Sequence, residues 1–259
     1  MPSALEVRFR RVVPRLREPA ARSAYVRSEI DVRPDADVAD ALDGICGASE
    51  QADPVAREVL ASVLPLLCEP EMQARFAVLR QVALERSLLP LCRLLRRPPA
   101  PRTGATEEDA PPAKVATARD GRPLTLGERR ALARRPSRAA LDRVLMDPHP
   151  MVVRNVLGNP RLTEDDVLRL VTRRPAVPGA IAEVARHPAW SQRARLRMAI
   201  VQNPGTPAEL SLPLVRLLVR PELVRLLRSP DVPTVVRAAA KEMLERRPPV
   251  PERRDLPRQ

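Results

Sequence analysis

The chain contains an internal repeat of about 40 residues, and a repeat of that length restricts the folds that the chain can adopt. Residues 152–160 and 196–204 both end in Asn-Pro, 44 residues apart. Residues 235–240 (Val-Val-Arg-Ala-Ala-Ala) resemble the start of the first segment, 83 residues earlier. A unit this short cannot bury an apolar face alone, so its stability has to come from stacking on its neighbours. We therefore divide this part of the chain into three units of about 40 residues: 123–160, 161–204 and 205–247.

Helix-start signals predict three short helices in each unit. In the second unit, Thr163 and Asp166 have the spacing of a capping box. Pro178 suits the first turn of the next helix, and we expect Ser191 to cap the third. Aromatic residues make up only 2 % of the chain, which argues against a β-sandwich. The predicted fold class is all-α: a C-terminal α-solenoid of about three 40-residue helical repeats over 122–247, preceded by a small helical N-terminal domain.

The N-terminal domain is predicted over residues 1–96. Asp53-Pro54 is a helix-start signal, with aspartate at the cap and proline at the first helical position. Residues 84–95 are apolar enough for a central helix, which Pro90 should restart or kink.

Two further segments and the first 34 residues of that domain are less regular. Within residues 1–34, the stretch 7–13 fits either a short strand or an extended arm. Residues 97–121 lack apolar periodicity and hold five prolines between Pro98 and Pro112, so we expect a flexible linker. The proline- and arginine-rich residues 248–259 are expected to form a disordered tail.

Charge is divided unevenly along the chain. Residues 1–121 hold 18 basic and 18 acidic residues, whereas residues 122–259 hold 27 and 14, so the whole excess of +13 lies in the second part. A basic surface favours nucleic acid or an acidic protein as the partner. Lys114 and Lys241 are the only lysines, however, and an excess of arginine, alanine and proline is typical of a GC-rich genome.

Two segments resemble known helical repeats. Residues 231–244, which begin Asp-Val-Pro-Thr-Val-Val-Arg, resemble the second helix of a HEAT repeat. Residues 147–163, with Met-Val-Val-Arg-Asn-Val-Leu inside them, look more like the leucine-rich repeat variant family, a bacterial α-helical solenoid. The resemblance covers about 123–247, although the units are longer than a typical variant repeat. It implies a right-handed superhelix used for binding, and it implies no particular reaction.

Arginines at recurring positions are the candidate binding residues. Arg154, Arg237 and, less cleanly aligned, Arg197 fall at similar points of their units. They either form a basic ladder that grips phosphates or acidic side chains, or pair with Asp147 and Asp231 within the fold.

A second set of arginines lies at predicted helix ends: Arg134, Arg135, Arg173 and Arg174. Cations there complement the helix dipole, and because the set repeats without acidic neighbours, it is also the best candidate for an exposed basic stripe. Trp190 either marks a binding pocket or fills a gap between helices.

No catalytic, metal-binding or phosphate-binding motif stands out, so we expect a protein that is not an enzyme and has no cofactor or metal. The charged N-terminus does not resemble a signal peptide, and no stretch is apolar enough for a membrane span. Cys46, Cys68 and Cys92 lack metal-ligand spacing and fit reduced thiols. We therefore expect a cytoplasmic protein with no membrane partner and no evident small-molecule substrate.

The favoured function is a non-enzymatic scaffold whose basic solenoid surface binds an acidic protein partner. The alternative is sequence-non-specific binding of duplex nucleic acid through phosphate contacts, since the scarcity of aromatic residues opposes stacking on single strands. The least favoured function is that of a HEAT-like DNA glycosylase, which rests on a resemblance of fold alone.

Overall fold

The computed structural model describes residues 2–97, 115–118 and 120–248 of the 259-residue chain. Within these ranges the protein is all-helical and has no β-strand, which confirms the predicted all-α class. Thr117 and Pro123 form an isolated antiparallel bridge. Residues 98–114 of the expected linker, and all of the expected tail except Pro248, lie outside the described residues.

In the N-terminal half, the described residues 2–97 form six α-helices and two 3-10 turns: α1 (Ala4–Val12), η1 (Val13–Arg15), α2 (Pro19–Val32), α3 (Asp35–Glu50), α4 (Pro54–Leu67), η2 (Pro70–Met72), α5 (Gln73–Glu85) and α6 (Leu89–Leu94). Asp53 caps α4 by accepting a hydrogen bond from the Ala56 amide at 2.7 Å, as the sequence predicted. Pro90 lies in the first turn of α6, so the apolar run over 84–95 is divided between two helices.

The prediction of a strand or an arm near residue 7 was wrong, because this segment is helical. Ser3 accepts a hydrogen bond from the Glu6 amide at 3.1 Å and so begins α1. Leu5, Phe9 and Val13 recur every four residues and are all buried, which gives the helix a core-facing side. The alternating exposure that a half-buried strand requires is absent from this segment.

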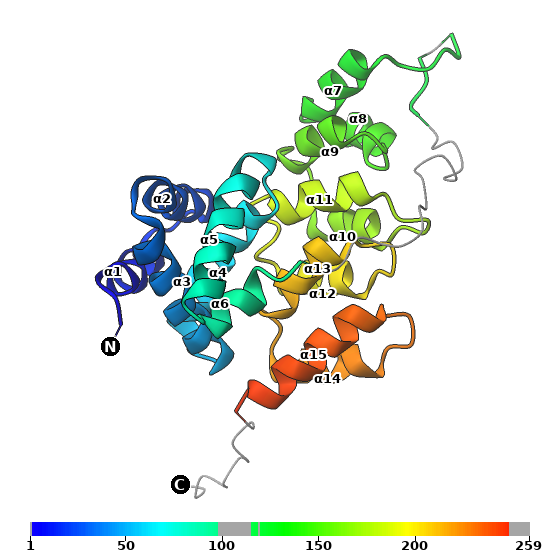
Figure 1. Cartoon of the computed structure of the whole chain (residues 1–259). Coiled ribbons are helices and arrows are strands. Elements are labelled where there is room, and N and C mark those ends of the chain that lie inside the picture. The colour runs from blue at the N-terminus through cyan, green and yellow to red at the C-terminus, as the bar shows by residue number, and fades with distance from the viewer. Residues whose placement is uncertain (1, 98–114, 119, 249–259) are drawn as a thin grey trace, which may run out of the picture.

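The described residues 120–248 form nine helices in three successive groups of three: α7 (Leu126–Arg134), α8 (Arg138–Val144) and α9 (Pro150–Leu157); α10 (Glu164–Thr172), α11 (Pro178–Arg186) and α12 (Ala194–Gln202); α13 (Ala208–Val215), α14 (Arg220–Arg228) and α15 (Thr234–Arg246). In each group the first helix packs on the third. Figure 1 shows the groups following one another from α7 to α15, with the N-terminal helices beside them.

Two of the predicted helix starts in the second group are confirmed and one is wrong. Thr163 and Asp166 form a capping box at the start of α10, and α11 begins at Pro178. Ser191 does not cap α12, which begins at Ala194 with Arg193 in the cap position. The buried Ser191 hydroxyl instead faces the Pro188 carbonyl oxygen at 3.5 Å, within the turn that precedes the helix.

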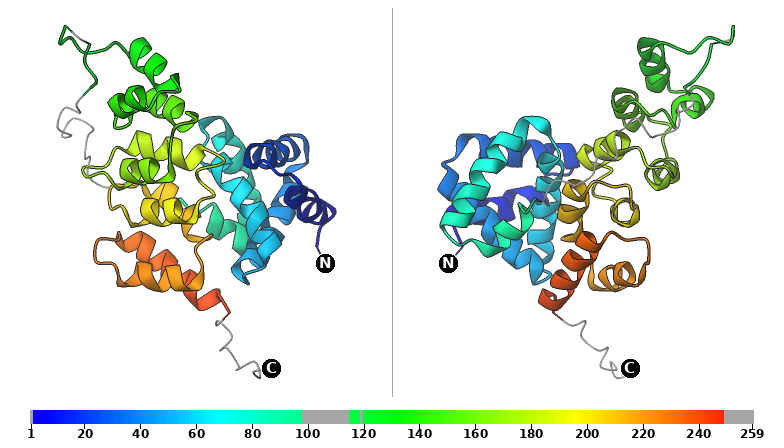
Figure 2. Two further views of the ribbon diagram at one scale, coloured as in Figure 1. Left: turned by 180° about the vertical axis from the view of Figure 1, so that it is seen from behind. Right: turned by 45° about the vertical axis from the view of Figure 1, so that its right-hand side comes forward.

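One hydrophobic core extends through both halves of the chain. It joins residues of α1–α6 to residues of α9–α15, and α4 packs directly on α11. Helices α7–α9 enclose a second, smaller core around Leu141, Val144 and Val156. In both views of Figure 2, α7 and α8 stand clear of the N-terminal half, whereas Leu157 of α9 lines a pocket together with Glu69 and Pro70 of that half.

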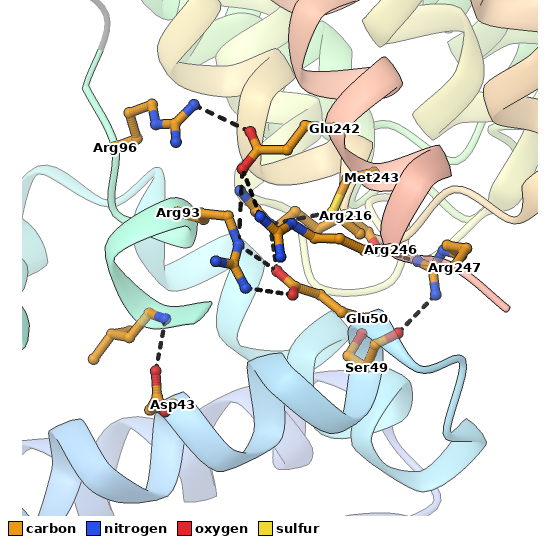
Figure 3. Close-up of polar contacts among 11 residues, drawn as sticks. Asp43, Ser49, Glu50, Arg93, Arg96, Arg216, Glu242, Met243, Arg246 and Arg247 are labelled. Carbon is orange, nitrogen blue, oxygen red and sulfur yellow. Dashed lines mark hydrogen bonds and ion pairs between the residues drawn. The ribbon is translucent and has the colours of Figure 1, made fainter. Parts of the chain in front are cut away.

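Polar contacts also join the halves, and Glu50 at the end of α3 lies at their centre (Figure 3). Its carboxylate accepts hydrogen bonds from Arg93 of α6 at 2.5 and 2.9 Å and from Arg216 at 2.8 Å. All three side chains are less than 10 % exposed. Arg57 and Arg186 add bonds to the backbone carbonyls of Leu217 and Cys68 across the same boundary. The halves therefore form one packed body.

Candidate protein-binding surface

The repeated Asn-Pro dipeptides form one type of turn, which joins the end of the third helix of a group to the end of the first. Asn159 follows α9, and its amide nitrogen donates to the carbonyl oxygens of Ala133 at 2.6 Å and Arg135 at 2.8 Å. Asn203 follows α12 and donates to Val171 at 2.7 Å and Arg173 at 3.4 Å. Both asparagines are buried. Each one satisfies carbonyl groups that the end of a helix leaves free.

In the third group an arginine makes the equivalent contact between the ends of the third and first helices. Arg247 precedes Pro248 and lies 44 residues after Asn203. Its guanidinium donates to the carbonyl oxygen of Arg216, at the end of α13, at 2.6 Å. The other terminal nitrogen donates to the Ser49 carbonyl oxygen of the N-terminal half at 2.7 Å. Burial lowers the pKa of Arg247 to about 10.

The first helix of each group has an arginine at its C-terminal cap: Arg135, Arg173 and Arg216. The three differ in what their guanidinium groups contact. Arg216 is buried against Glu50. Arg173 is half-buried and donates to the Met146 carbonyl oxygen at 2.9 Å, and Arg135 is exposed. Neither Arg135 nor Arg173 forms an ion pair with a residue that the structure describes.

A groove of about 400 Å³ lies between α10, α12 and α14, beside the Asn203 turn. Its apolar floor includes Leu168 and Met198, and three arginines line it: Arg174, Arg195 and Arg225. All of its lining residues come from the C-terminal half, so the N-terminal helices do not cover it. We use the name arginine surface for these three residues together with Arg135 and Arg173.

The arginines of this groove are weakly held. Arg174 pairs with Asp231 at 3.1 Å, and both side chains are more than half exposed. Arg195 pairs with Asp165 at 3.2 Å in a similarly exposed contact, and Arg225 forms no ion pair with the described residues. Exposed pairs of this kind contribute about 0–1 kcal/mol, so a carboxylate from another molecule can replace them at little cost.

The arginines of the proposed ladder face partners within the fold, and these are not the aspartates considered from the sequence. Arg154 of α9 holds the buried Glu183 of α11 at 2.8 and 3.2 Å. Asp147 pairs instead with Arg129 of α7 at 2.6 Å. The ladder position in the first unit therefore ties α9 to α11.

The other two ladder positions also contact their own chain. Arg237 of α15 donates to three carbonyl oxygens of the turn before its helix, among them Ser229 at 3.1 Å. Arg197 is half-buried and donates to the Gln192 carbonyl oxygen, and burial lowers the pKa of its guanidinium. Arg134 is exposed and reaches the Arg130 carbonyl oxygen of its own helix at 3.3 Å.

Trp190 is half-buried in the turn between α11 and α12. Its indole nitrogen donates to the Leu157 carbonyl oxygen at the end of α9, at 2.9 Å. The Arg193 guanidinium lies over the ring, 5.7 Å from its centroid, and the His187 ring lies beside it. The indole therefore joins three helices at one junction.

Arg195, Arg225 and Arg247 belong to this surface or to its turns, but they are not among the candidates predicted from the sequence. Arg247-Pro248 had a usable signal, because it continues the 44-residue spacing of the two Asn-Pro dipeptides. Arg195 and Arg225 lie on different helices 30 residues apart, and no sequence pattern places them in one groove.

Among the residues that the structure describes, no group of three histidine, cysteine, aspartate or glutamate side chains is placed to hold a metal ion. No described helix combines the length and the apolar character needed to cross a membrane.

The chain matches no protein-family model, and neither curated proteins nor solved structures show a match.

Proposed function

We propose that this protein is a non-enzymatic interaction scaffold that binds an acidic protein partner through its arginine surface. In this proposal residues 122–247 form three HEAT-like or leucine-rich-repeat-variant-like units, which stack into a basic α-solenoid. The three equivalent turns at Asn159, Asn203 and Arg247 support the division into units. The net charge of +13 in residues 122–259 supports an acidic partner.

The observation that carries the proposal is the contact between Arg216 and Glu50. The third unit already binds a carboxylate through the arginine at the end of its first helix, at 2.8 Å and with both groups buried. The equivalent arginines of the first two units, Arg135 and Arg173, have no carboxylate among the described residues. The protein thus contains an internal example of the binding that we propose for the other two positions.

The groove beside Arg173 extends this surface. Arg174, Arg195 and Arg225 surround an apolar floor that includes Leu168 and Met198. A partner segment with acidic and apolar side chains has contacts available on both parts of the groove. Interfaces are enriched in arginine and methionine in this way.

Fluorescence anisotropy of the full chain tests the proposal, because the shared core makes the isolated C-terminal half an unsuitable sample. The probes are a labelled peptide of ten glutamates and a labelled DNA duplex, each titrated at several salt concentrations. The variant Arg135→Glu/Arg173→Glu reverses two charges of the arginine surface. The matched control is Arg15→Glu/Arg17→Glu, which reverses two exposed arginines of the N-terminal half.

We expect the acidic peptide to bind, the surface variant to weaken that binding at least tenfold, and the control to change it by less than twofold. Equal losses in both variants would mean that net charge alone attracts the peptide, and the proposed surface would be wrong. Tighter binding of the duplex than of the peptide, with a steep dependence on salt, would favour the nucleic-acid alternative instead.

A further inference from the structure

A second groove lies at the boundary between the two halves. It has a volume of about 470 Å³ and is bordered by α5 and α6 on one side and by α11 and α13 on the other. Small-molecule sites have volumes of roughly 300–1,000 Å³ and are frequent where two packed units meet. This groove is separate from the arginine surface, since the two share no residue.

The N-terminal wall presents one face of α5 to the groove. Gln73, Phe76 and Arg80 have the spacing of neighbours on one side of a helix. Phe76 is buried in the core and supplies apolar surface at the base, and Leu94 and Leu95 of α6 extend this surface. Arg80 is half-buried at the end of the face.

The opposite wall presents one face of α11. Pro178, Ala182 and Arg186 recur every four residues along it, and Leu210 and Pro213 of α13 complete it. The small Ala182 side chain in the middle of this wall leaves the groove open. On both walls an arginine follows an apolar residue one helical turn earlier: Arg80 follows Phe76, and Arg186 follows Ala182.

The charges of the groove are unbalanced. Among the residues that the structure describes, four arginines line it against one carboxylate, that of Glu209. Arg96 pairs with Glu242 at 3.2 Å and Arg186 with Glu183 at 2.7 Å, so these two are already compensated. Arg97 contacts the neutral amide oxygen of Gln73, and Arg80 forms no ion pair with the described residues. Cations next to apolar surface are thus available to an anion.

We propose that this groove binds an elongated anionic amphiphile, a medium-chain carboxylate whose chain lies between Phe76 and Leu210 and whose carboxylate pairs with Arg80. The apolar walls remove the chain from water, which stabilises the complex in proportion to the apolar surface that is buried. Arg80 is free to form a charge-assisted hydrogen bond with the carboxylate. A nucleotide fits less well, because Phe76 is the only aromatic residue among the described residues that line the groove. The inference goes beyond the proposed function, since it concerns another surface and another class of ligand.

Isothermal titration calorimetry of the full chain tests this inference with three probes of equal chain length: octanoate, octan-1-ol and octylamine, each below its solubility and aggregation limits. We expect octanoate to bind at one site, octan-1-ol to bind at least tenfold more weakly, and the octylammonium ion to show no binding. Equal affinities for octanoate and octan-1-ol would overturn the role of the arginine.

Two variants and a control locate the site. Arg80→Gln should weaken octanoate at least fivefold and leave octan-1-ol unchanged. Ala182→Phe fills the middle of the groove and should abolish binding of both probes, with circular dichroism checking that the variant is folded. Arg228→Gln removes an exposed arginine of α14, outside the groove, and should change neither affinity. If Arg80→Gln binds octanoate like the unmodified protein, the proposed site is wrong, whether or not Ala182→Phe folds. The acidic-peptide experiment remains independent, because neither groove variant alters the arginine surface.

Discussion

Arg247 donates a hydrogen bond to the carbonyl oxygen of Arg216 at 2.6 Å, and this bond ties the end of α15 to the end of α13. In the first two groups an asparagine makes the equivalent contact. The longer arginine side chain also reaches the Ser49 carbonyl oxygen, while Arg216 itself reaches Glu50. The turn that closes the third group therefore also fixes the N-terminal half in place.

Removing the charge of Glu50 should destabilise the whole protein. Glu50→Gln leaves Arg93 and Arg216 buried without a carboxylate between them, and breaking a buried pair in this way costs about 3–5 kcal/mol. Because one core spans both halves, we expect a single unfolding transition in urea. Its midpoint should move to a lower urea concentration, and the free energy of unfolding should fall by that amount. Far-UV circular dichroism measures the transition.

The control is Glu245→Gln, which changes an exposed residue of α15. It should change the free energy of unfolding by less than about 0.5 kcal/mol, as surface substitutions usually do. Adding Arg216→Met to Glu50→Gln should recover part of the loss, since it removes one of the unpaired charges. A Glu50→Gln variant as stable as the unmodified protein would show that the network does not hold the halves together.

Asn203 should contribute more to stability than an ordinary polar residue at a helix end. Asn203→Ala leaves the carbonyl oxygens of Val171 and Arg173 and the amide of Gly205 without their side-chain partner. An unsatisfied buried polar group costs about 1–3 kcal/mol. Urea unfolding followed by the emission of Trp190, the only tryptophan, measures the loss next to this unit.

Asn155→Ala is the matched control, because the Asn155 amide donates only to the Met151 carbonyl oxygen of its own helix. We expect Asn155→Ala to lower the free energy of unfolding by no more than half as much as Asn203→Ala does. Equal losses would mean that the Asn-Pro turns are not special, and would weaken the division into units that rests on them.

Much of the fold was predictable because helix ends depend on local chemistry. The Thr163–Asp166 capping box and the starts at Pro54 and Pro178 need only neighbouring residues, and the structure has all of them. The prediction for Ser191 was wrong because a serine hydroxyl that could cap a helix can equally donate a hydrogen bond within the turn that precedes the helix. The expectation of a strand or an arm over residues 7–13 was wrong, because the cap at Ser3 begins a helix that continues through this stretch.

The arrangement around the candidate surface was not predictable to the same degree. The spacing of apolar residues shows which side of a helix is buried, but it does not show which other helix covers that side. No sequence pattern therefore predicted that α11 packs on α4. The partner of Arg154 illustrates the limit. Glu183 lies 29 residues away, whereas the sequence suggested Asp147, only seven residues away.

Trp190 should stabilise the junction of α9, α11 and α12 through both its ring and its indole nitrogen. Trp190→Phe keeps most of the apolar surface but leaves the Leu157 carbonyl oxygen without its donor, so we expect a loss of about 1 kcal/mol. Trp190→Ala also removes the packing of the ring, and since the ring is only half-buried we expect a loss of about 2–3 kcal/mol, below the range for a fully buried aromatic residue. Circular dichroism in urea measures both, and a larger loss for phenylalanine than for alanine would contradict this account of the ring.

Stability at acid pH should depend on Asp166. Hydrogen bonds from the Arg138 guanidinium, supported by those from Thr163, hold the pKa of the Asp166 carboxyl far below its usual value of about 4. The unfolded chain therefore takes up this proton at a higher pH than the folded chain does. The stabilisation from Asp166 is complete above about pH 4 and is lost as the pH falls toward the lower, folded-state pKa.

Urea unfolding at pH values from 7 to 2 measures this contribution as a difference between variants. Asp166→Asn cannot titrate, so the free energy by which it is less stable than the unmodified protein should be constant from pH 7 to about pH 4 and should shrink below that. Asp165→Asn changes the adjacent, exposed carboxylate, whose pair with Arg195 lies at the surface, and should give a small difference at every pH. If the difference for Asp166→Asn stayed constant down to pH 2, the ionised carboxylate would not be what Arg138 stabilises in the folded protein.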